Sequence, residues 1–204
     1  MEQNISFKKE VEKILEQTKE IKGNVRGEIL LDIFNYILEK KGKSGIKAVE
    51  EKLKEVDYPL KFEAIRFFEW YPNRSALLVM LVIGEIFHWD DSDFFKMGNS
   101  APKYSLITKM LMKYLISVKR ICREAPKYWR KHFDFGELEL KVNEEQKNLI
   151  IKIKGHNFIP SVCAYNAGFF LRVIQFCVKS KKTTIEETKC MLRGDPHHEY
   201  IVKW

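Results

Sequence analysis

The stretch GELELKVNEEQKNLIIKIK, residues 136–154, decides the fold of this chain. Apolar and charged residues alternate over 138–142 and again over 149–153, with Asn143 and Glu144 between the two runs. A period of two is typical of a strand that buries one face, and a polar pair between two such runs predicts a turn. The stretch therefore predicts an antiparallel β-hairpin.

A helix and a second hairpin follow this stretch. Residues 161–177 are almost wholly apolar and come directly after Pro160, a residue that favours the first turn of a helix. Two further strands are expected near 183–192 and 198–204, joined by the turn at Gly194, Asp195 and Pro196. The C-terminal part is thus expected to be hairpin, helix, hairpin.

Helical patterns fill the chain before residue 136. Apolar spacing predicts helices over 5–20, 26–41, 46–56 and 62–88, the last divided at Tyr71-Pro72-Asn73 with Ser75 capping its second half. A short helix is expected over 90–97, ended by Gly98-Asn99-Ser100, and a long one over 104–123. Pro126 is then expected to interrupt the chain before a short helix over 128–133. This order predicts an α+β fold, with N-terminal helices packed on a C-terminal antiparallel sheet.

Composition predicts one domain. The 204 residues are 45% hydrophobic, which is enough for a sizeable core, and we expect a single domain over 1–204. Its parts are a helical N-terminal part (1–57), a helical core (58–135) and the sheet part (136–204). The longest apolar run, 76–84, is too short for a membrane span, and the charged N-terminus is unlike a signal peptide. We therefore expect a cytoplasmic protein with reduced cysteines; its Lys and Glu content would suit a thermophile.

The net charge of +8 is concentrated in one segment. Residues 1–57 hold twelve basic and twelve acidic side chains, whereas 101–133 hold nine basic residues against Glu124 alone. A basic helix face attracts anionic partners, and an acidic protein partner is expected here. Nucleic acid is not favoured, because no recognisable binding module accompanies the charge.

The end of the chain gathers metal-ligand side chains. Cys163 lies in the first turn of its predicted helix, where the helix dipole favours a thiolate. In the last hairpin, a bulge near Thr188 or Lys189 would turn Glu187 and Cys190 to the same side, and His198 opens the returning strand across the turn. Two sulfurs, an imidazole and a carboxylate suit zinc. The alternative is two buried cysteines beside a surface Glu and His.

A family resemblance supports the metal interpretation. The stretch SVCAYNAGFFLRVIQFC…EETKCMLRGDPHHEYIVKW, residues 161–204, resembles the 4-vinyl-reductase, or hydrocarbon-binding, domain, which includes the aromatic-sensing domains of phenol-responsive regulators. Transport-particle (TRAPP) small subunits have a related fold. The family signature is a Cys-bearing helix followed by E-x-x-C-x-x-x-G-[DE]-x-x-C-x-[FY]. The resemblance implies a zinc site at Cys163, Glu187, Cys190 and, in place of the last cysteine, His198.

The longer context is similar to an uncharacterised bacterial family numerous in myxobacteria. The shared features are the early helix KGNVRGEILLDIFNYILEKKGKSG, the step at Trp70-Tyr71-Pro72, the Ala125-Pro126…Trp129 block and a C…RG…Y…W ending. This resemblance covers most of the chain in positions of low specificity. It implies a ligand-binding domain of the nitric-oxide-signalling or TRAPP-like fold, and no established activity.

The resemblance also implies a cavity for an apolar or aromatic small molecule. Large apolar side chains are available to line it, although a stripe of such residues at helical spacing is more often simply core. The expected function is a non-enzymatic sensor or adaptor, with zinc structural because four protein ligands leave no open position. The candidate lining residues are Met80, Ile83, Phe87, Phe94, Met110, Tyr114, Phe158, Tyr165 and Phe169.

Three alternatives remain open. A haem-based gas sensor is one, since a distantly similar family binds haem and nitric oxide, with His88 and His132 as candidate axial ligands. That family's Y-x-S-x-R motif is absent, because YPNRS and YLISVKR have the wrong spacing, and haem ranks below zinc. An enzyme using Cys163 and His198 as nucleophile and base ranks below the metal. The last is an interaction module acting as a homodimer, as the transport-particle subunits suggest.

Overall fold

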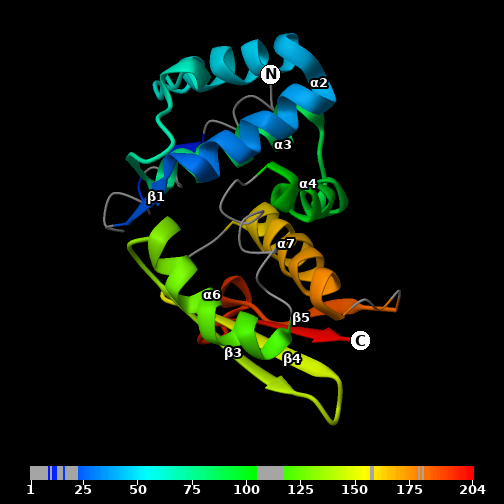
Figure 1. Cartoon of the computed structure of the whole chain (residues 1–204). Helices are drawn as coiled ribbons and strands as arrows, with labels where there is room; N and C mark the ends of the chain where they lie inside the picture. The colour runs from blue at the N-terminus through cyan, green and yellow to red at the C-terminus, as the bar shows by residue number, and fades with distance from the viewer. Residues whose placement is uncertain are drawn as a thin grey trace. The chain divides into compact units, whose positions relative to one another are not determined.

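The computed structural model describes residues 9, 11–12, 16, 23–104, 117–156, 159–178, 180 and 182–204. The chain forms two compact units, Met1–Asp90 and Asp91–Trp204, and each is described by itself (Figure 1). The single domain expected over 1–204 stays a prediction. The helix expected over 5–20 lies almost wholly outside the described residues.

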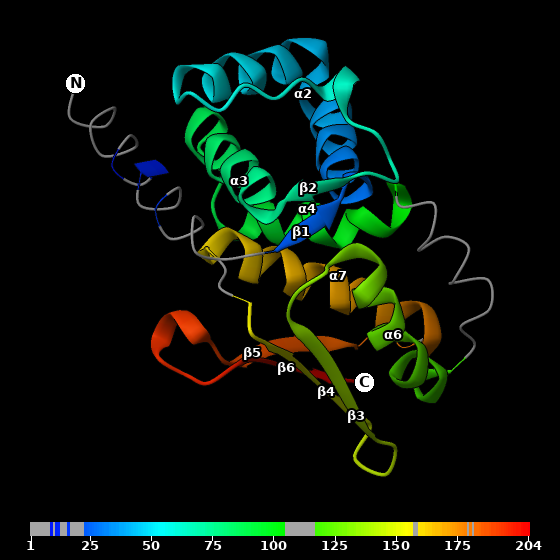
Figure 2. The same cartoon turned by 90° about the vertical axis from the view of Figure 1, so that its left-hand side faces the viewer.

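A long bent helix, α2 (Gly27–Glu55), runs through the first unit. Gly42 interrupts it with φ 68° and ψ −168°, a conformation open to glycine and costly for other residues. The two halves therefore run in different directions (Figure 2). The break falls within the predicted GKSG stop, so the prediction of two successive helices is confirmed.

A small two-stranded sheet was missed by the sequence pattern. β1 (Asn24–Arg26) pairs antiparallel with β2 (Trp70–Pro72), with Val25 opposite Tyr71. The helix predicted to begin at residue 62 is wrong over this stretch, where only the 3₁₀ turn η1 (Phe62–Ala64) forms. Because a residue before proline is disfavoured in the helical region, Tyr71 adopts extended backbone and ends any helix before Pro72.

Helix α3 (Asn73–Phe87) begins directly after Pro72. The prediction that Ser75 caps this helix is wrong, because Ser75 lies inside its first turn and its hydroxyl is 2.7 Å from the Tyr58 hydroxyl. The helix ends at His88, which has a left-handed conformation with φ 53°.

In the second unit, helix α4 (Asp91–Tyr104) passes through the predicted stop at Gly98-Asn99-Ser100. Gly98 serves close packing instead: a Cβ there would lie 1.9 Å from the carbonyl oxygen of Tyr165 in α7 (Pro160–Val178). Gly168 of α7 meets the Phe95 carbonyl of α4 in the same way, at 2.0 Å. The two glycines let α4 and α7 approach backbone to backbone, so here glycine marks a contact and not a helix end.

Helix α6 (Val118–His132) begins at a polar cap. The Ser117 hydroxyl accepts a hydrogen bond from the Arg120 amide at 3.3 Å. The helix predicted over 104–123 thus contains a new start at residue 118, and residues 105–116 lie outside the described part. Pro126 was expected to interrupt the chain, yet α6 continues through it, so that prediction is wrong.

The sheet of the second unit has four antiparallel strands in the order β3-β4-β6-β5 (Figure 2). They are β3 (Glu137–Asn143), β4 (Asn148–Lys154), β5 (Thr184–Lys189) and β6 (His198–Lys203). Leu140 pairs with Ile151 in the first hairpin, as the alternation predicts. A 3₁₀ turn, η2 (Met191–Arg193), follows β5. Both predicted hairpins are confirmed, although the strand predicted over 183–192 ends at Lys189.

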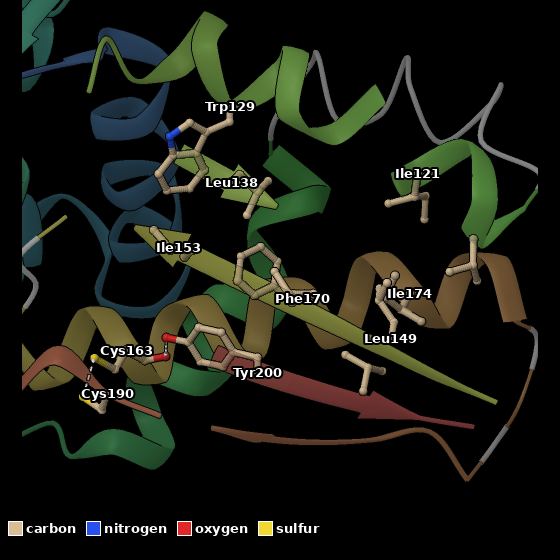
Figure 3. Close-up of a cluster of buried hydrophobic side chains, with 13 residues drawn as sticks. Ile121, Trp129, Leu138, Leu149, Ile153, Cys163, Phe170, Ile174, Cys190 and Tyr200 are labelled. Carbon is tan, nitrogen blue, oxygen red and sulfur yellow. Dashed lines mark hydrogen bonds between the residues drawn. The ribbon is translucent and has the colours of Figure 1, made fainter. Parts of the chain in front are cut away.

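The core of the second unit lies between this sheet and the helices α6 and α7 (Figure 3). Trp129 and Ile121 reach it from α6, Phe170 and Ile174 from α7, and alternate residues from the strands. The α+β class is therefore confirmed. Packing of the N-terminal helices on the sheet is not, because those helices belong to the other unit. By length and composition alone, α7 could cross a membrane, which is weak evidence for a span.

Candidate functional site

Cys163 stands in the first turn of α7. Its amide donates to the Ile159 carbonyl at 3.4 Å, and its own carbonyl accepts from the Tyr200 hydroxyl at 3.3 Å. These bonds fix the start of α7 against the central strand β6. The Cys163 sulfur is buried and lies beside the Cys190 sulfur (Figure 3).

A bulge in β5 brings Glu187 and Cys190 to the same face of the sheet. Glu187 lies opposite Tyr200 and Lys189 opposite Glu199, so Thr188 is the extra residue. The Thr188 hydroxyl donates to the Glu199 carboxylate at 2.9 Å, which holds the extra residue on the other side. Without the bulge, strand parity would place Glu187 and Cys190 on opposite faces. The predicted bulge is confirmed at its predicted position.

The turn after β5 holds Cys190 in place. The Asp195 carboxylate accepts from the Cys190 amide at 2.8 Å, while the amides of Arg193 and Asp195 both donate to the Cys190 carbonyl. Gly194, with φ 91°, supplies the left-handed residue that closes the turn. The backbone on both sides of Cys190 is therefore satisfied, and only its sulfur points to the cluster.

His198 completes the cluster from the start of β6. Its side chain is fully buried, and its Nδ1 atom lies 3.1 Å from a Glu187 carboxylate oxygen and 3.8 Å from the Cys163 sulfur. The two sulfurs are 4.0 Å apart. One donor atom from each of the four residues lies within 4.8 Å of every other. The structure therefore gathers all four predicted ligands: Cys163, Glu187, Cys190 and His198.

Burial dominates the electrostatics of this cluster. Burial, with the neighbouring Glu187 and Cys190, raises the pKa of the Cys163 thiol well above its usual range. Desolvation therefore opposes the thiolate that the helix dipole favours at Cys163. Burial also acts to raise the pKa of Glu187. The hydrogen bond to His198 and the charge of Arg193, 3.7 Å away, outweigh this effect, so the pKa of Glu187 lies below its usual value.

The nine predicted ligand-lining residues are divided between the units. Met80, Ile83 and Phe87 belong to the first unit, where the first two are buried in its core. Phe94, Tyr165 and Phe169 belong to the second. Their assignment to a ligand cavity stays a prediction, and three members lie outside the described residues: Met110, Tyr114 and Phe158.

The two candidate haem ligands differ in their surroundings. His88 is exposed at the end of α3. His132, at the end of α6, is half-buried, and its Nδ1 atom lies 2.8 Å from the Tyr128 carbonyl oxygen. Because a carbonyl only accepts, Nδ1 is the donor of this bond, and a bond of this kind orients the ring of a metal-binding imidazole. The donor chemistry of His132 fits axial haem ligation better than that of His88.

A further histidine was missed by sequence reasoning. His156 is buried at the end of β4, and its ring packs against Trp129, Phe133 and Phe135, the last at a centroid distance of 4.5 Å. The one signal in the sequence that could have identified His156 is its position directly after Gly155, the glycine that ends the strand. It serves as part of an aromatic cluster between α6 and β4.

The comparisons with known proteins identify a fold. The chain is similar to solved H-NOX (haem nitric oxide/oxygen-binding) domains. One, a Tt variant, is 14% identical with a TM-score of 0.63 and covers 88% of this chain and 94% of its own. The S. oneidensis H-NOX in its Fe(II)NO state is 13% identical, with a TM-score of 0.58 and coverages of 87% and 98%. A third, described as probing heme distortion in the H-NOX family, is also 13% identical, with a TM-score of 0.58 and coverages of 88% and 94%.

At this identity the likeness shows the fold alone. No protein-family model matches the chain, and no curated protein matches it. The order of helices and strands in this chain is therefore that of the H-NOX fold, over almost the full length of the compared domains.

These findings correct the predicted family. The resemblance to the 4-vinyl-reductase or hydrocarbon-binding domain, to TRAPP subunits and to the myxobacterial family is wrong, because the matching structures are H-NOX domains. The resemblance rested chiefly on one short Cys-Glu-Cys-His ribbon. Such a ribbon can be built on different scaffolds, whereas the topology of the whole chain identifies the fold.

Two functional predictions that relied on this family are also wrong. The sensor or adaptor for an apolar small molecule, with structural zinc, is contradicted, because the neighbours are H-NOX proteins and the haem alternative agrees with them better. Ranking zinc above haem as the cofactor is wrong for the same reason. The ranking relied on the missing Y-x-S-x-R motif, and a short motif is a weaker guide than topology over 87% of the chain.

Proposed function

We propose that this chain is a cytoplasmic, haem-based gas-sensing domain and not an enzyme. The observation that carries the proposal is the likeness to H-NOX structures over 87–88% of the chain, one of them in an Fe(II)NO state. Haem would supply an iron atom with a coordination position for a diatomic gas. The protein's part is to present an axial ligand and to exclude water.

His132 is the residue that would hold haem iron. It ends α6, whose Trp129 is buried in the core and stacks on Phe133 at a centroid distance of 4.3 Å. The Tyr128 carbonyl fixes the ring orientation and tautomer of His132, which is the usual support for a metal-binding imidazole. No Y-x-S-x-R string is present in the sequence to clamp the haem propionates.

Haem reconstitution tests the proposal directly. We expect purified chain, after growth with added haem or after titration with hemin, to show a saturable Soret band that shifts when nitric oxide is added. His132→Gly should abolish the Soret band of protein-bound haem, and added free imidazole should restore it. His88→Ala should leave this band unchanged. A colourless preparation after both treatments would refute haem binding, and loss on His88→Ala alone would refute the ligand assignment.

We further propose that α6 contacts the sensor's acidic protein partner. Its exposed cations Arg120, Arg123, Lys127 and Arg130 are spaced three or four residues apart and so form one stripe along the helix. Glu124 pairs with Arg123 and Lys127, while Arg120 and Arg130 have no ion pair among the described residues. The stripe therefore keeps an excess of positive charge for carboxylates. A homodimer stays a prediction.

A further inference from the structure

Three separations between donors of the Cys163 cluster are close to those of a tetrahedral metal centre, and all four donors lie within 4.8 Å of one another. Ordinary metal–sulfur, metal–nitrogen and metal–oxygen bonds give S–S, S–N and N–O separations of ~3.8, ~3.6 and ~3.4 Å around a tetrahedral ion. The observed separations are 4.0 Å between the sulfurs, 3.8 Å from the Cys163 sulfur to His198 Nδ1 and 3.1 Å from that nitrogen to Glu187. Each differs from the ideal by a few tenths of an ångström.

Hydrogen bonding alone explains this convergence poorly. His198 Nδ1 can carry one proton, yet it faces both the Glu187 carboxylate and the Cys163 sulfur. Two thiols 4.0 Å apart gain little from each other, since a thiol is a weak donor and a weak acceptor. One cation at the centre would interact favourably with all four groups at once. It would also compensate the cost of burying two thiolates.

The surroundings of the cluster position the ligands as metal sites require. The Arg193 guanidinium lies 3.7 Å from one Glu187 oxygen, while the other faces His198. Asp195 holds the backbone of Cys190, and Tyr200 holds that of Cys163. The ligands therefore come from α7, β5, the following turn and β6, and three of them, Cys163, Glu187 and Cys190, are held by contacts outside the cluster.

We propose that Cys163, Glu187, Cys190 and His198 bind one thiophilic divalent transition-metal ion, separate from haem. Neither His88 nor His132 belongs to this set, so the inference does not depend on the proposed gas-sensing function. Two thiolates, an imidazole and a carboxylate exclude magnesium and calcium, which take oxygen ligands. With four protein ligands the ion has no open position, and its role is to fasten the start of α7 to β5 and β6.

Cobalt titration of the full chain tests the site. Co²⁺ is the probe, because a tetrahedral thiolate complex gives thiolate-to-metal charge-transfer bands and intense visible bands. The reduced, chelator-treated protein should bind one Co²⁺ per chain with these bands, whether or not it binds haem. Glu187→Gln should weaken Co²⁺ binding at least tenfold, beyond the loss usual for supporting residues. Glu186→Gln, on the opposite face of the same strand, should not change it.

Thiol protection gives a second measurement that needs no variant. In the wild-type chain, bound Co²⁺ should slow alkylation of Cys163 and Cys190 while leaving Cys122 and Cys177 unchanged, as read by peptide mass spectrometry. Binding of less than one Co²⁺, octahedral spectra, or equal protection of all four thiols would overturn the proposal. So would a Cys163–Cys190 disulfide that forms readily in air and persists with Co²⁺ present.

Discussion

The sulfur atoms of Cys163 and Cys190 lie 4.0 Å apart although 27 residues separate them in the chain. One stands at the start of a helix and the other just after a strand, and a β-bulge between Glu187 and Lys189 makes the meeting possible. The local backbone thus deviates from a regular ladder at the point where the donor side chains converge. Bulges that redirect a side chain are typical of functional positions.

Asp195 should support the proposed metal site without being a ligand. Replacing it with alanine removes the acceptor of the Cys190 amide, 2.8 Å away, and loosens the turn that places the Cys190 sulfur. We expect Asp195→Ala to weaken Co²⁺ binding about 10–100-fold with the tetrahedral spectrum kept, the range usual for supporting residues. Glu144→Ala, in the exposed first hairpin turn, is the control. Equal affinity of the Asp195→Ala variant and wild type would show that the turn is fixed by other contacts.

The cysteines outside the cluster should be slow to react at neutral pH. Burial raises the pKa of both the Cys122 and Cys177 thiols. Since only the thiolate reacts, iodoacetamide labelling of these two should be slower in the native chain than in urea at pH 7, and should increase above pH 9. A labelling rate that is independent of pH between 7 and 10 would contradict this.

The raised pKa values of Cys122 and Cys177 also predict how the stability of the fold changes with pH. The folded chain holds these protons to higher pH than the unfolded chain, so the stabilisation is complete below the unfolded thiol pKa of about 8.5 and is lost as the pH rises further. The free energy of unfolding by urea should therefore decrease above about pH 9. The double variant Cys122→Ala/Cys177→Ala should show a smaller decrease, and an equal one would contradict the assignment.

Alternating patterns were the reliable part of the sequence. The run Leu138, Leu140, Val142 predicted β3 because a strand with one buried face has a period of two, and the structure has β3 at 137–143. The bulge that brings Glu187 and Cys190 to one side was predicted on the premise that Ile185 and Leu192 are both core residues. The bulge is present, but that premise is wrong for Leu192, which is exposed and lies in η2 beyond the end of β5. The strand prediction depended on local geometry only, whereas the bulge prediction also depended on which residues are buried.

Tertiary contacts account for the misplaced helix boundaries. Gly98 looks like a helix end in the sequence, but its missing side chain serves the approach of α7 some seventy residues away. Ser75 has the composition of a cap, yet its hydroxyl meets Tyr58. Trp70-Tyr71-Pro72 pairs with a strand whose partner residues lie near position 25. No local pattern carries these long-range contacts, and the family was misassigned for a related reason: one ribbon was weighed above the whole topology.

The close approach of α4 and α7 should be intolerant of any side chain. Gly168→Ala would place a Cβ 2.0 Å from the Phe95 carbonyl oxygen, so one helix must shift away from the other. We expect Gly168→Ala, and likewise Gly98→Ala, to lower the free energy of unfolding by about 2 kcal/mol or more. Lys96→Ala, an exposed position on α4, should change it by no more than about 0.5 kcal/mol. Wild-type stability for both glycine variants in urea unfolding would refute the packing.

The basic stripe of α6 should bind acidic polypeptides through charge. Poly-L-glutamate is the probe, and its affinity for the full chain should decrease as salt rises, because exposed charges are screened beyond about 10 Å at 0.1 M. Arg120→Glu/Arg130→Glu should weaken binding at least tenfold. Lys43→Glu/Lys47→Glu, at exposed positions of α2, changes the net charge equally and should weaken it much less. Equal losses for the two double variants would show that net charge and not the stripe is responsible, and tighter binding of single-stranded DNA than of poly-L-glutamate would reject a protein partner.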